Sequence, residues 1–225
     1  MRLDKILATR GGYSRKEVSK MIRRGRVLVD GERCKEPKTH FEEEVRLEVD
    51  GFEIDPSYPL YMYHKPMGMV TTTVDSWGRE CVGDILPVHY HIVGRLDKET
   101  HGLLLFSRDG QLTQHLLHPK RAIEREYIAT VAGEPTEALI EKLAEGIETS
   151  VGLAKGKVLS IEGDKVRVVM TEGRNRIVRR MLHNAGHSVI DLYRVRFGPF
   201  LLDDLEEGTR KAITNKDLEQ LGLRK

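Results

Sequence analysis

The chain has 225 residues, of which 39% are hydrophobic and 32% charged, and its formal net charge is +2 at pH 7. This length allows one or two domains with a sizeable core, and the composition is that of a globular protein. No apolar run approaches the roughly 18 residues of a membrane span, and the charged N-terminus lacks an apolar signal segment. Cys34 and Cys81 are too few for a disulfide framework and lack metal-ligand spacing. We therefore expect a cytoplasmic protein with reduced thiols and no membrane association.

Positive charge is concentrated in residues 1–35, which hold eleven lysines and arginines against four acids. Such a local excess is expected of a surface that binds nucleic acid. Apolar residues at helical spacing predict a short helix ending at Gly11-Gly12. A second helix is predicted to begin after Ser14, which can form a capping box with Glu17, and to stop at Gly25. The candidate RNA-binding side chains of this region are Arg2, Lys5, Arg15, Lys16, Lys20, Arg23 and Arg24.

The two basic helices are followed by segments at 27–29 and 45–49 that predict a small sheet. The sequences Arg-Leu-Asp-Lys near the start and Ser-Arg-Lys-Glu at the second helix resemble the alpha-L RNA-binding domain of a small-subunit ribosomal protein. The simpler interpretation is a basic helical hairpin with a solvated charged face. The resemblance implies an RNA-binding domain over residues 1–54, and the segment Asp-Pro-Ser-Tyr-Pro predicts a linker at 55–59.

Residues 60–225 are predicted to form a larger α+β domain with a mixed, mainly antiparallel sheet. The expected elements are strands at 60–63, 103–106, 127–131, two within 154–170 and one at 188–195, and helices capped by Asp109, Thr136 and Thr214. The helix after Thr136 is expected to turn Leu139, Ile140 and Leu143 inward. The chain has no internal repeat and no glycine-rich phosphate loop of the Walker or Rossmann kind.

The loop from Gly94 to Gly102 carries Asp97 and precedes an apolar run at 103–106, which predicts a short buried strand. The two glycines permit tight backbone paths at the ends of the loop. An aspartate on a rigidly anchored loop can act as a nucleophile or a base. From the local residues alone, a solvated or arginine-paired turn aspartate is the simpler interpretation.

A run of four arginines marks the segment 172–182. On a helix, the apolar residues of 178–182 would face the core and leave Arg176, Arg179 and Arg180 on the opposite side. Neighbouring like charges repel one another unless an anion or an acid lies opposite them. Together with Arg174, these side chains predict a phosphate-binding surface, and a solvated arginine face is the alternative.

The loop sequence Gly-Arg-Leu-Asp-Lys-Glu-Thr-His-Gly-Leu-Leu-Leu-Phe resembles the catalytic motif of the RsuA-type ribosomal pseudouridine synthases. In that family the aspartate is a nucleophile that acts on a flipped-out uridine, and the base detaches, turns and rejoins through carbon. The Lys-Pro-Xaa-Gly turn at 65–68 also recurs at the start of the family's catalytic domain. The resemblance spans nearly the whole chain and implies an rRNA pseudouridine synthase, an isomerase that needs no cofactor and no metal.

The resemblance also implies roles for individual residues. Asp97 would be the nucleophile, Tyr127 would stack on the base and accept a proton, and Arg179 would form an ion pair with Asp97. Arg95, on the same loop, is placed to fill the space of the flipped base. The predicted substrate-binding residues are Arg95, Leu96, Arg174, Arg176, Val178 and Arg180.

The chain departs from the family pattern at two positions. Ile177 stands where a Gln or Glu is common, which removes one polar contact, and His101 stands where Thr or Ser is frequent. We expect His101 to contact substrate or solvent without a catalytic role. The histidine pairs at 89 and 91 and at 115 and 118 lack a third ligand nearby, so we predict no metal site.

The predicted partner is ribosomal RNA or a ribosomal precursor particle, bound by a monomer. The layout of the sequence favours small-subunit (16S) RNA, whereas the Gly-Arg-Asn-Arg segment also occurs in large-subunit (23S) relatives. Two other functions fit parts of the sequence. A ribosome-assembly factor would bind RNA without isomerising it, and an Asp-nucleophile hydrolase of small molecules would leave the basic N-terminus unexplained.

Overall fold

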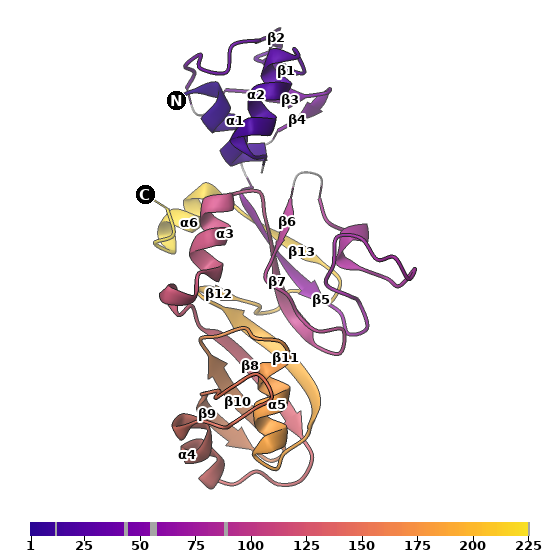
Figure 1. The fold of residues 1–225 in the computed structure, drawn as a ribbon, viewed down its shortest axis with the longest axis vertical. Helices are drawn as coiled ribbons and strands as arrows, with labels where there is room; N and C mark the ends of the chain where they lie inside the picture. The colour runs from indigo at the N-terminus through magenta and orange to yellow at the C-terminus, as the bar shows by residue number, and fades with distance from the viewer. Residues whose placement is uncertain (12, 43–44, 55–57, 88–89, 225) are drawn as a thin grey trace.

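The computed structural model describes residues 1–11, 13–42, 45–54, 58–87 and 90–224. Figure 1 shows a small N-terminal unit at one end of the long axis and a larger unit along the rest of it. The middle of the expected linker, residues 55–57, and Gly12 at the expected helix end lie outside the described residues, as does His89. No helix in the described part of the chain combines the length and the apolar character that crossing a membrane requires.

The N-terminal unit packs two helices against a four-stranded sheet of order β2-β1-β3-β4. Its elements are α1 (Leu3–Gly11), α2 (Arg15–Arg23), β1 (Val27–Val29), β2 (Glu32–Arg33), β3 (Leu47–Val49) and β4 (Phe52–Glu53). The predicted capping box is confirmed, because Ser14 and Glu17 exchange backbone-to-side-chain hydrogen bonds of 3.3 and 2.9 Å. This reciprocal pair satisfies two amide groups that the first turn would otherwise leave free. Leu7, Ile22 and Leu47 are buried in the core between helices and sheet.

The larger unit is built on a nine-stranded sheet. Its main path runs β13-β5-β7-β11-β8-β10-β9, with β6 paired to β7 and β12 paired to β11. The strands are β5 (Leu60–Lys65), β6 (His91–Val93), β7 (His101–Ser107), β8 (Arg125–Val131), β9 (Lys157–Glu162), β10 (Lys165–Met170), β11 (Val189–Phe197), β12 (Phe200–Leu201) and β13 (Arg210–Ile213). Strands β7 and β11 pair in parallel, and the other described pairings are antiparallel. The predicted α+β class with a mixed, mainly antiparallel sheet is confirmed.

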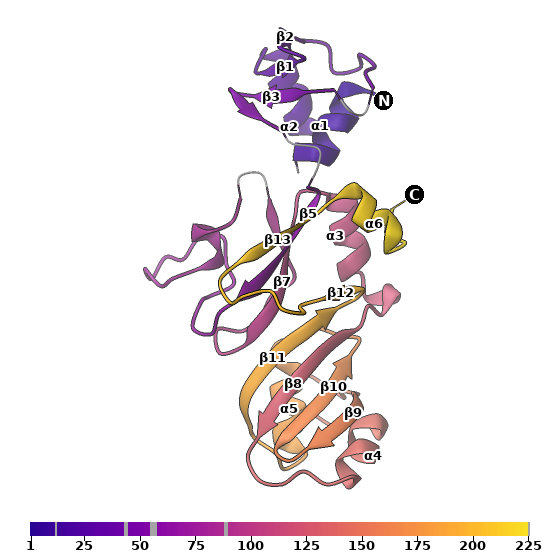
Figure 2. The same ribbon diagram turned by 180° about the vertical axis from the view of Figure 1, so that it is seen from behind.

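Helices cover this sheet in two groups. They are α3 (Gly110–Leu117), α4 (Ala138–Glu145), α5 (Ile177–Asn184) and α6 (Asn215–Gln220), with short 3-10 turns at Val82–Asp84 and Pro119–Arg121. Figures 1 and 2 show α3 and α6 beside the half of the sheet that holds β5, β7 and β13, and α4 and α5 beside β8 to β10. Strand β7 is buried on both faces, because Leu103 and Leu105 belong to one apolar cluster and Leu104 and Phe106 to another. Burial on both faces explains its continuous apolar sequence.

Several local predictions differ from the structure. Strand β7 begins at His101, so Gly102 lies inside a strand and does not end the loop. Helix α4 has Glu137 as its N-cap and no side-chain capping bond, and Ile140 remains 38% exposed, so the predicted cap at Thr136 is wrong. Helix α5 begins only at Ile177, because Arg176 adopts a left-handed conformation with φ of 51°.

A buried histidine gives the fold a testable dependence on pH. In β6, the Nε2 atom of His91 lies 2.7 Å from the hydroxyl of Thr113, and burial lowers the pKa of His91 despite the opposing effect of Asp109. In the unfolded chain the imidazole of His91 is protonated with a pKa near 6.5, whereas in the folded chain it is protonated only at lower pH. Protonation of His91 therefore favours unfolding. We expect the unfolding free energy of the wild type to fall relative to that of His91→Gln as pH drops from about 7 to about 5. Urea denaturation of both proteins measures this, and parallel pH profiles would contradict it.

Candidate active site

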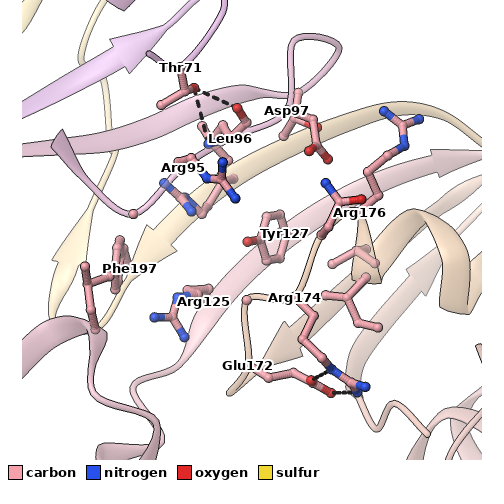
Figure 3. Close-up of a pocket in the computed structure, with 18 of the residues that line it drawn as sticks. Thr71, Arg95, Leu96, Asp97, Arg125, Tyr127, Glu172, Arg174, Arg176 and Phe197 are labelled. Atoms are coloured by element: carbon pink, nitrogen blue, oxygen red, sulfur yellow. Dashed lines mark hydrogen bonds and ion pairs between the residues drawn. The ribbon is translucent and has the colours of Figure 1, made fainter. Parts of the chain in front are cut away.

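The predicted Asp97 loop lines a pocket of about 810 Å³. The walls come from this loop, from β8, from the segment before α5 and from β11, as Figure 3 shows. Seven of the predicted site residues line the pocket, and they come from several elements: Arg95, Leu96, Asp97, Tyr127, Arg174, Arg176 and Val178. The fold thus brings residues up to 83 positions apart in sequence, from Arg95 to Val178, to one cavity.

The backbone on both sides of Asp97 is anchored. The Thr71 hydroxyl donates to the Leu96 carbonyl at 2.6 Å and accepts from the Leu96 amide at 3.3 Å, as drawn in Figure 3. The Lys98 carbonyl accepts from the Gly68 amide at 2.8 Å, and the Asp97 carbonyl accepts from the Thr100 amide at 3.0 Å. These bonds fix the loop before any substrate arrives, which is what a positioned nucleophile requires. Sequence reasoning missed Thr71, because its partner lies 25 residues away in the sequence.

The Asp97 side chain is half-buried and lies on the side of the pocket opposite Tyr127 (Figure 3). Within the described residues, its carboxylate accepts no hydrogen bond and forms no ion pair of 4 Å or less. Tyr127, in β8, is only 8% exposed. Leu96 and Val178 are buried as well, so an apolar platform lies next to a carboxylate that has no hydrogen bond and no close ion pair among the described residues. This combination suits a planar, uncharged ring brought up to a nucleophile.

Arg179 does not form the predicted direct ion pair with Asp97. Its two terminal nitrogens donate to backbone carbonyls, to that of Glu99 at 2.6 Å and to that of Val189 at 3.2 Å, and its Nε is buried without a hydrogen-bond partner among the described residues. It is not among the residues that line the pocket. Burial lowers the pKa of Arg179, as does Arg176, while the nearby negative charge of Asp97 raises it. Arg179 is therefore bonded to the Asp97 loop at Glu99 and lies close enough to Asp97 for their charges to interact.

The other three arginines of this region bind groups of their own chain. Arg174 contacts the Glu172 carboxylate and the carbonyls of Val151 and Leu153, and Figure 3 shows its pairing with Glu172. Arg176 donates to the Glu99 carboxylate at 2.7 Å, which lowers the pKa of Glu99. Both Arg174 and Arg176 line the pocket, with Arg176 41% exposed at its side chain.

Arg180 lies farther from the cavity. It donates to the backbone carbonyl of Asn175 at 3.1 Å, to the Asn175 side chain at 3.2 Å and to the Ser150 hydroxyl. It does not line the pocket. These contacts hold the segment before α5 against the loop near residue 150, so the arginine run organises one wall of the pocket as well as charging it.

Sequence reasoning missed three further cations in or beside the pocket. Arg125 and Arg194 both line the pocket, with their guanidinium groups 4.7 and 5.1 Å from the ring centre of Phe197. Lys65 is fully buried, and its pKa is lowered to about 8. Burial is the largest cause, the positive charge of Arg194 acts in the same direction, and the negative charge of Asp97 opposes both. One Arg194 nitrogen, Nη2, is buried without a hydrogen-bond partner among the described residues. A pocket with this many cations attracts an anionic ligand.

Comparison with known proteins places the chain among RNA-modifying enzymes. Residues 59–184 match the family model of RNA pseudouridylate synthase, and residues 1–47 match the S4 domain model. A ribosomal large subunit pseudouridine synthase B of Bacillus subtilis is 35% identical, over 98% of this chain and 95% of that protein. An uncharacterized RNA pseudouridine synthase of Mycobacterium leprae is 38% identical over 98% and 92%. A crystal structure of a pseudouridylate synthase superposes with a TM-score of 0.67 at 29% identity, over 98% and 99% of the two chains.

Proposed function

Because the chain belongs to the RNA pseudouridylate synthase family and carries an S4 domain at its N-terminus, we propose that it isomerises a uridine of large-subunit ribosomal RNA to pseudouridine. The observation that carries this proposal is the pocket in which the Asp97 carboxylate faces Tyr127. As part of the proposal, the enzyme acts as a monomer in the cytoplasm, on ribosomal RNA or a precursor particle.

The choice of ribosomal subunit corrects an expectation from the sequence. The inferred preference for small-subunit RNA is not supported, because the relatives from Bacillus subtilis and Vibrio vulnificus are both described as large-subunit synthases. The second of these is 36% identical over 98% of this chain. The large-subunit alternative therefore becomes the main proposal, and the Gly-Arg-Asn-Arg segment is consistent with it.

In this proposal the isomerisation begins with Asp97 as the nucleophile on the target uridine. The bond from the ribose to N1 of the base breaks, the base turns, and a bond from the same ribose carbon to C5 forms. The proton of C5 is lost and N1 gains one, so the product has the same composition as the substrate. Tyr127 lies under the base and relays the C5 proton, because its phenolic oxygen takes that proton as its own proton passes to N1 or to solvent. Leu96 and Val178 hold the ring by apolar contact.

Access to a base inside folded RNA requires the base to leave its stack. Arg95 is exposed and lines the pocket, two residues before Asp97, and the structure describes no hydrogen bond or ion pair for it. Its long side chain is free to enter the space that the base leaves. Arg125, Arg176 and Arg194 then provide positive charge beside the phosphates that flank the flipped nucleotide.

The S4 domain supplies the second RNA contact in this proposal. All seven predicted basic side chains are exposed there: Arg2, Lys5, Arg15, Lys16, Lys20, Arg23 and Arg24. Arg2 is bound to Asp4 through a hydrogen bond of 3.0 Å, which leaves the cations of α2 and of Lys5 as the stronger candidates for phosphate contacts.

Replacing Lys16, Lys20 and Arg23 together by alanine should weaken RNA binding without changing which uridine is modified. Phosphate contacts add affinity regardless of sequence, and removing one cation from a phosphate lowers the slope of log affinity against log salt by roughly 0.7 to 0.9. Titrations of RNA at several salt concentrations measure both effects. An unchanged slope would show that these side chains do not bind phosphate.

The test of the function uses transcripts of both ribosomal RNAs and the purified full chain. After incubation, chemical mapping of pseudouridine should show one or a few modified positions in large-subunit RNA and none in small-subunit RNA. Modification of small-subunit RNA alone would overturn the choice of target. Binding of RNA with no modification of deproteinised transcripts or of precursor particles would favour the assembly-factor alternative.

A further inference from the structure

Three side chains distant in sequence converge outside the Asp97 pocket. His64 comes from β5, His101 from β7, and Glu207 from the segment before β13. One nitrogen of each histidine and one carboxylate oxygen of Glu207 all lie within 4.8 Å of one another. None of the three residues lines the pocket that holds Asp97. The cluster forms because β5 pairs with both β7 and β13. These pairings join segments far apart in the sequence, so no local sequence pattern predicts the cluster.

The hydrogen bonds of His64 leave one ring nitrogen unused. Its Nδ1 lies 2.7 Å from the Leu205 carbonyl, which can only accept, so Nδ1 carries the hydrogen. In the neutral ring, Nε2 then presents a lone pair. The His64 side chain is more than nine-tenths buried. Its Nε2 atom is buried with it and has no hydrogen-bond partner among the described residues. A buried polar atom without a partner is costly unless something binds it.

His101 is oriented in the complementary way. Its Nε2 lies 3.1 Å from both carboxylate oxygens of Asp191, which fixes the hydrogen on Nε2. The lone pair of the neutral ring is then on Nδ1, which lies 4.0 Å from the Glu207 carboxylate. A lone pair and a carboxylate oxygen that face each other repel unless a proton or a metal cation lies between them. The Tyr193 ring stacks on His101 at 4.5 Å and on His64 at 5.6 Å, which holds both imidazoles in place.

We propose that His64, His101 and Glu207 bind a divalent transition-metal cation of the Zn²⁺ class. Two imidazole nitrogens and one carboxylate oxygen form a common zinc ligand set, with a water molecule in the fourth position. The nitrogen donors disfavour Ca²⁺ and Mg²⁺, which select oxygen ligands. Asp191 and the Leu205 carbonyl hold the far nitrogens of the two rings, as partners of metal-bound histidines generally do.

The geometry requires a small closure on binding. Tetrahedral ligation at about 2.1 Å places donor atoms roughly 3.4 Å apart, so the three groups must approach one another. Glu207 can supply its own part of this movement, because its side chain is 57% exposed. The same exposure leaves the fourth ligand position open to solvent. The bound cation would fasten the segment before β13 to β5 and β7, and its effect would be on the stability of the fold.

The first experiment titrates Zn²⁺ and, separately, Co²⁺ into the full chain, expressed without a histidine tag. The wild type should bind one equivalent, develop the visible absorption bands of low-symmetry Co²⁺, and unfold at a temperature several degrees higher with the metal. Glu207→Gln and His101→Gln should each lower the affinity by at least about tenfold, and Asp191→Asn should lower it by about 10- to 100-fold. His40→Gln, which removes an exposed histidine outside the cluster, should bind as the wild type does.

Glu207→Gln should remain folded, because an exposed side chain can be changed without disturbing the core. A change in its metal affinity therefore reports on ligation and not on loss of the fold. Equal affinity of wild type and Glu207→Gln, or no equimolar binding by a folded wild type, would overturn the proposal. Binding that His40→Gln weakens as strongly as His101→Gln would also overturn it, because the metal would then be held by surface histidines. Each of these measurements is independent of RNA modification.

Discussion

Asp97→Asn should abolish isomerisation while leaving the fold and RNA binding intact. An amide has the shape of the carboxylate but is a far poorer nucleophile, and loss of a catalytic nucleophile costs at least about 10⁴-fold in kcat. The Asp97 carboxylate takes part in no hydrogen bond or ion pair that the structure describes, so the substitution breaks no such bond within the described part of the protein. The measurement is the release of tritium from RNA labelled at C5 of uridine, under single-turnover conditions.

The control for this prediction is Asp164→Asn. Asp164 lies in the exposed turn between β9 and β10 and does not line the pocket, so its variant should release tritium at the wild-type rate. RNA affinity measured by filter binding should be unchanged in both variants. Turnover by Asp97→Asn within tenfold of the wild type would remove the nucleophilic role from Asp97.

Gly102→Ala should destabilise the catalytic domain by about 3 kcal/mol or more. Gly102 has φ of +108° at the parallel pairing of β7 with β11, and an added Cβ atom would lie 2.3 Å from the Arg194 carbonyl oxygen. Both the backbone conformation and the overlap with a backbone atom oppose any larger side chain. Because this pairing carries the Asp97 loop against the strand that holds Arg194, kcat should fall together with stability.

Urea denaturation measures this effect, with Gly110→Ala as the control. Gly110 is the first residue of α3, and an added Cβ atom there would meet no atom within 4 Å. Alanine at a helical position is neutral or stabilising by up to about 1 kcal/mol. A Gly102→Ala protein as stable as Gly110→Ala would show that β7 and β11 can separate at this point without cost.

Local sequence patterns correctly predicted the elements that are determined by interactions between residues close together in the sequence. The capping box of Ser14 and Glu17, the strand pair of 157–170 and the cap of the last helix by Thr214 are all present. Thr136 failed as a cap because the chain enters α4 one residue later, at Glu137. Gly102 was placed in a loop because nothing in its own segment indicates that β11 will pair beside it.

In the candidate site, too, contacts between residues far apart in the sequence could not be predicted. The loop motif indicated Asp97, the family resemblance implied Tyr127, and the fold places both at one pocket. The position of Arg179 on α5 was predicted, but the acceptors of its guanidinium are carbonyls brought near by the β11 and Asp97 segments. Arg194 and Lys65 lie in strands where their burial depends on partners remote in sequence. Such contacts follow from tertiary pairing and leave no periodic signal in the chain.

The most direct test replaces the chromosomal gene by one encoding Asp97→Asn and maps pseudouridine across both ribosomal RNAs. The expected result is the loss of one or a few pseudouridines from large-subunit RNA, with small-subunit RNA unchanged and the variant protein present at its normal level. Retention of every pseudouridine in large-subunit RNA, with the folded variant present and no other copy of the gene, would contradict the assignment of Asp97 and of the target together.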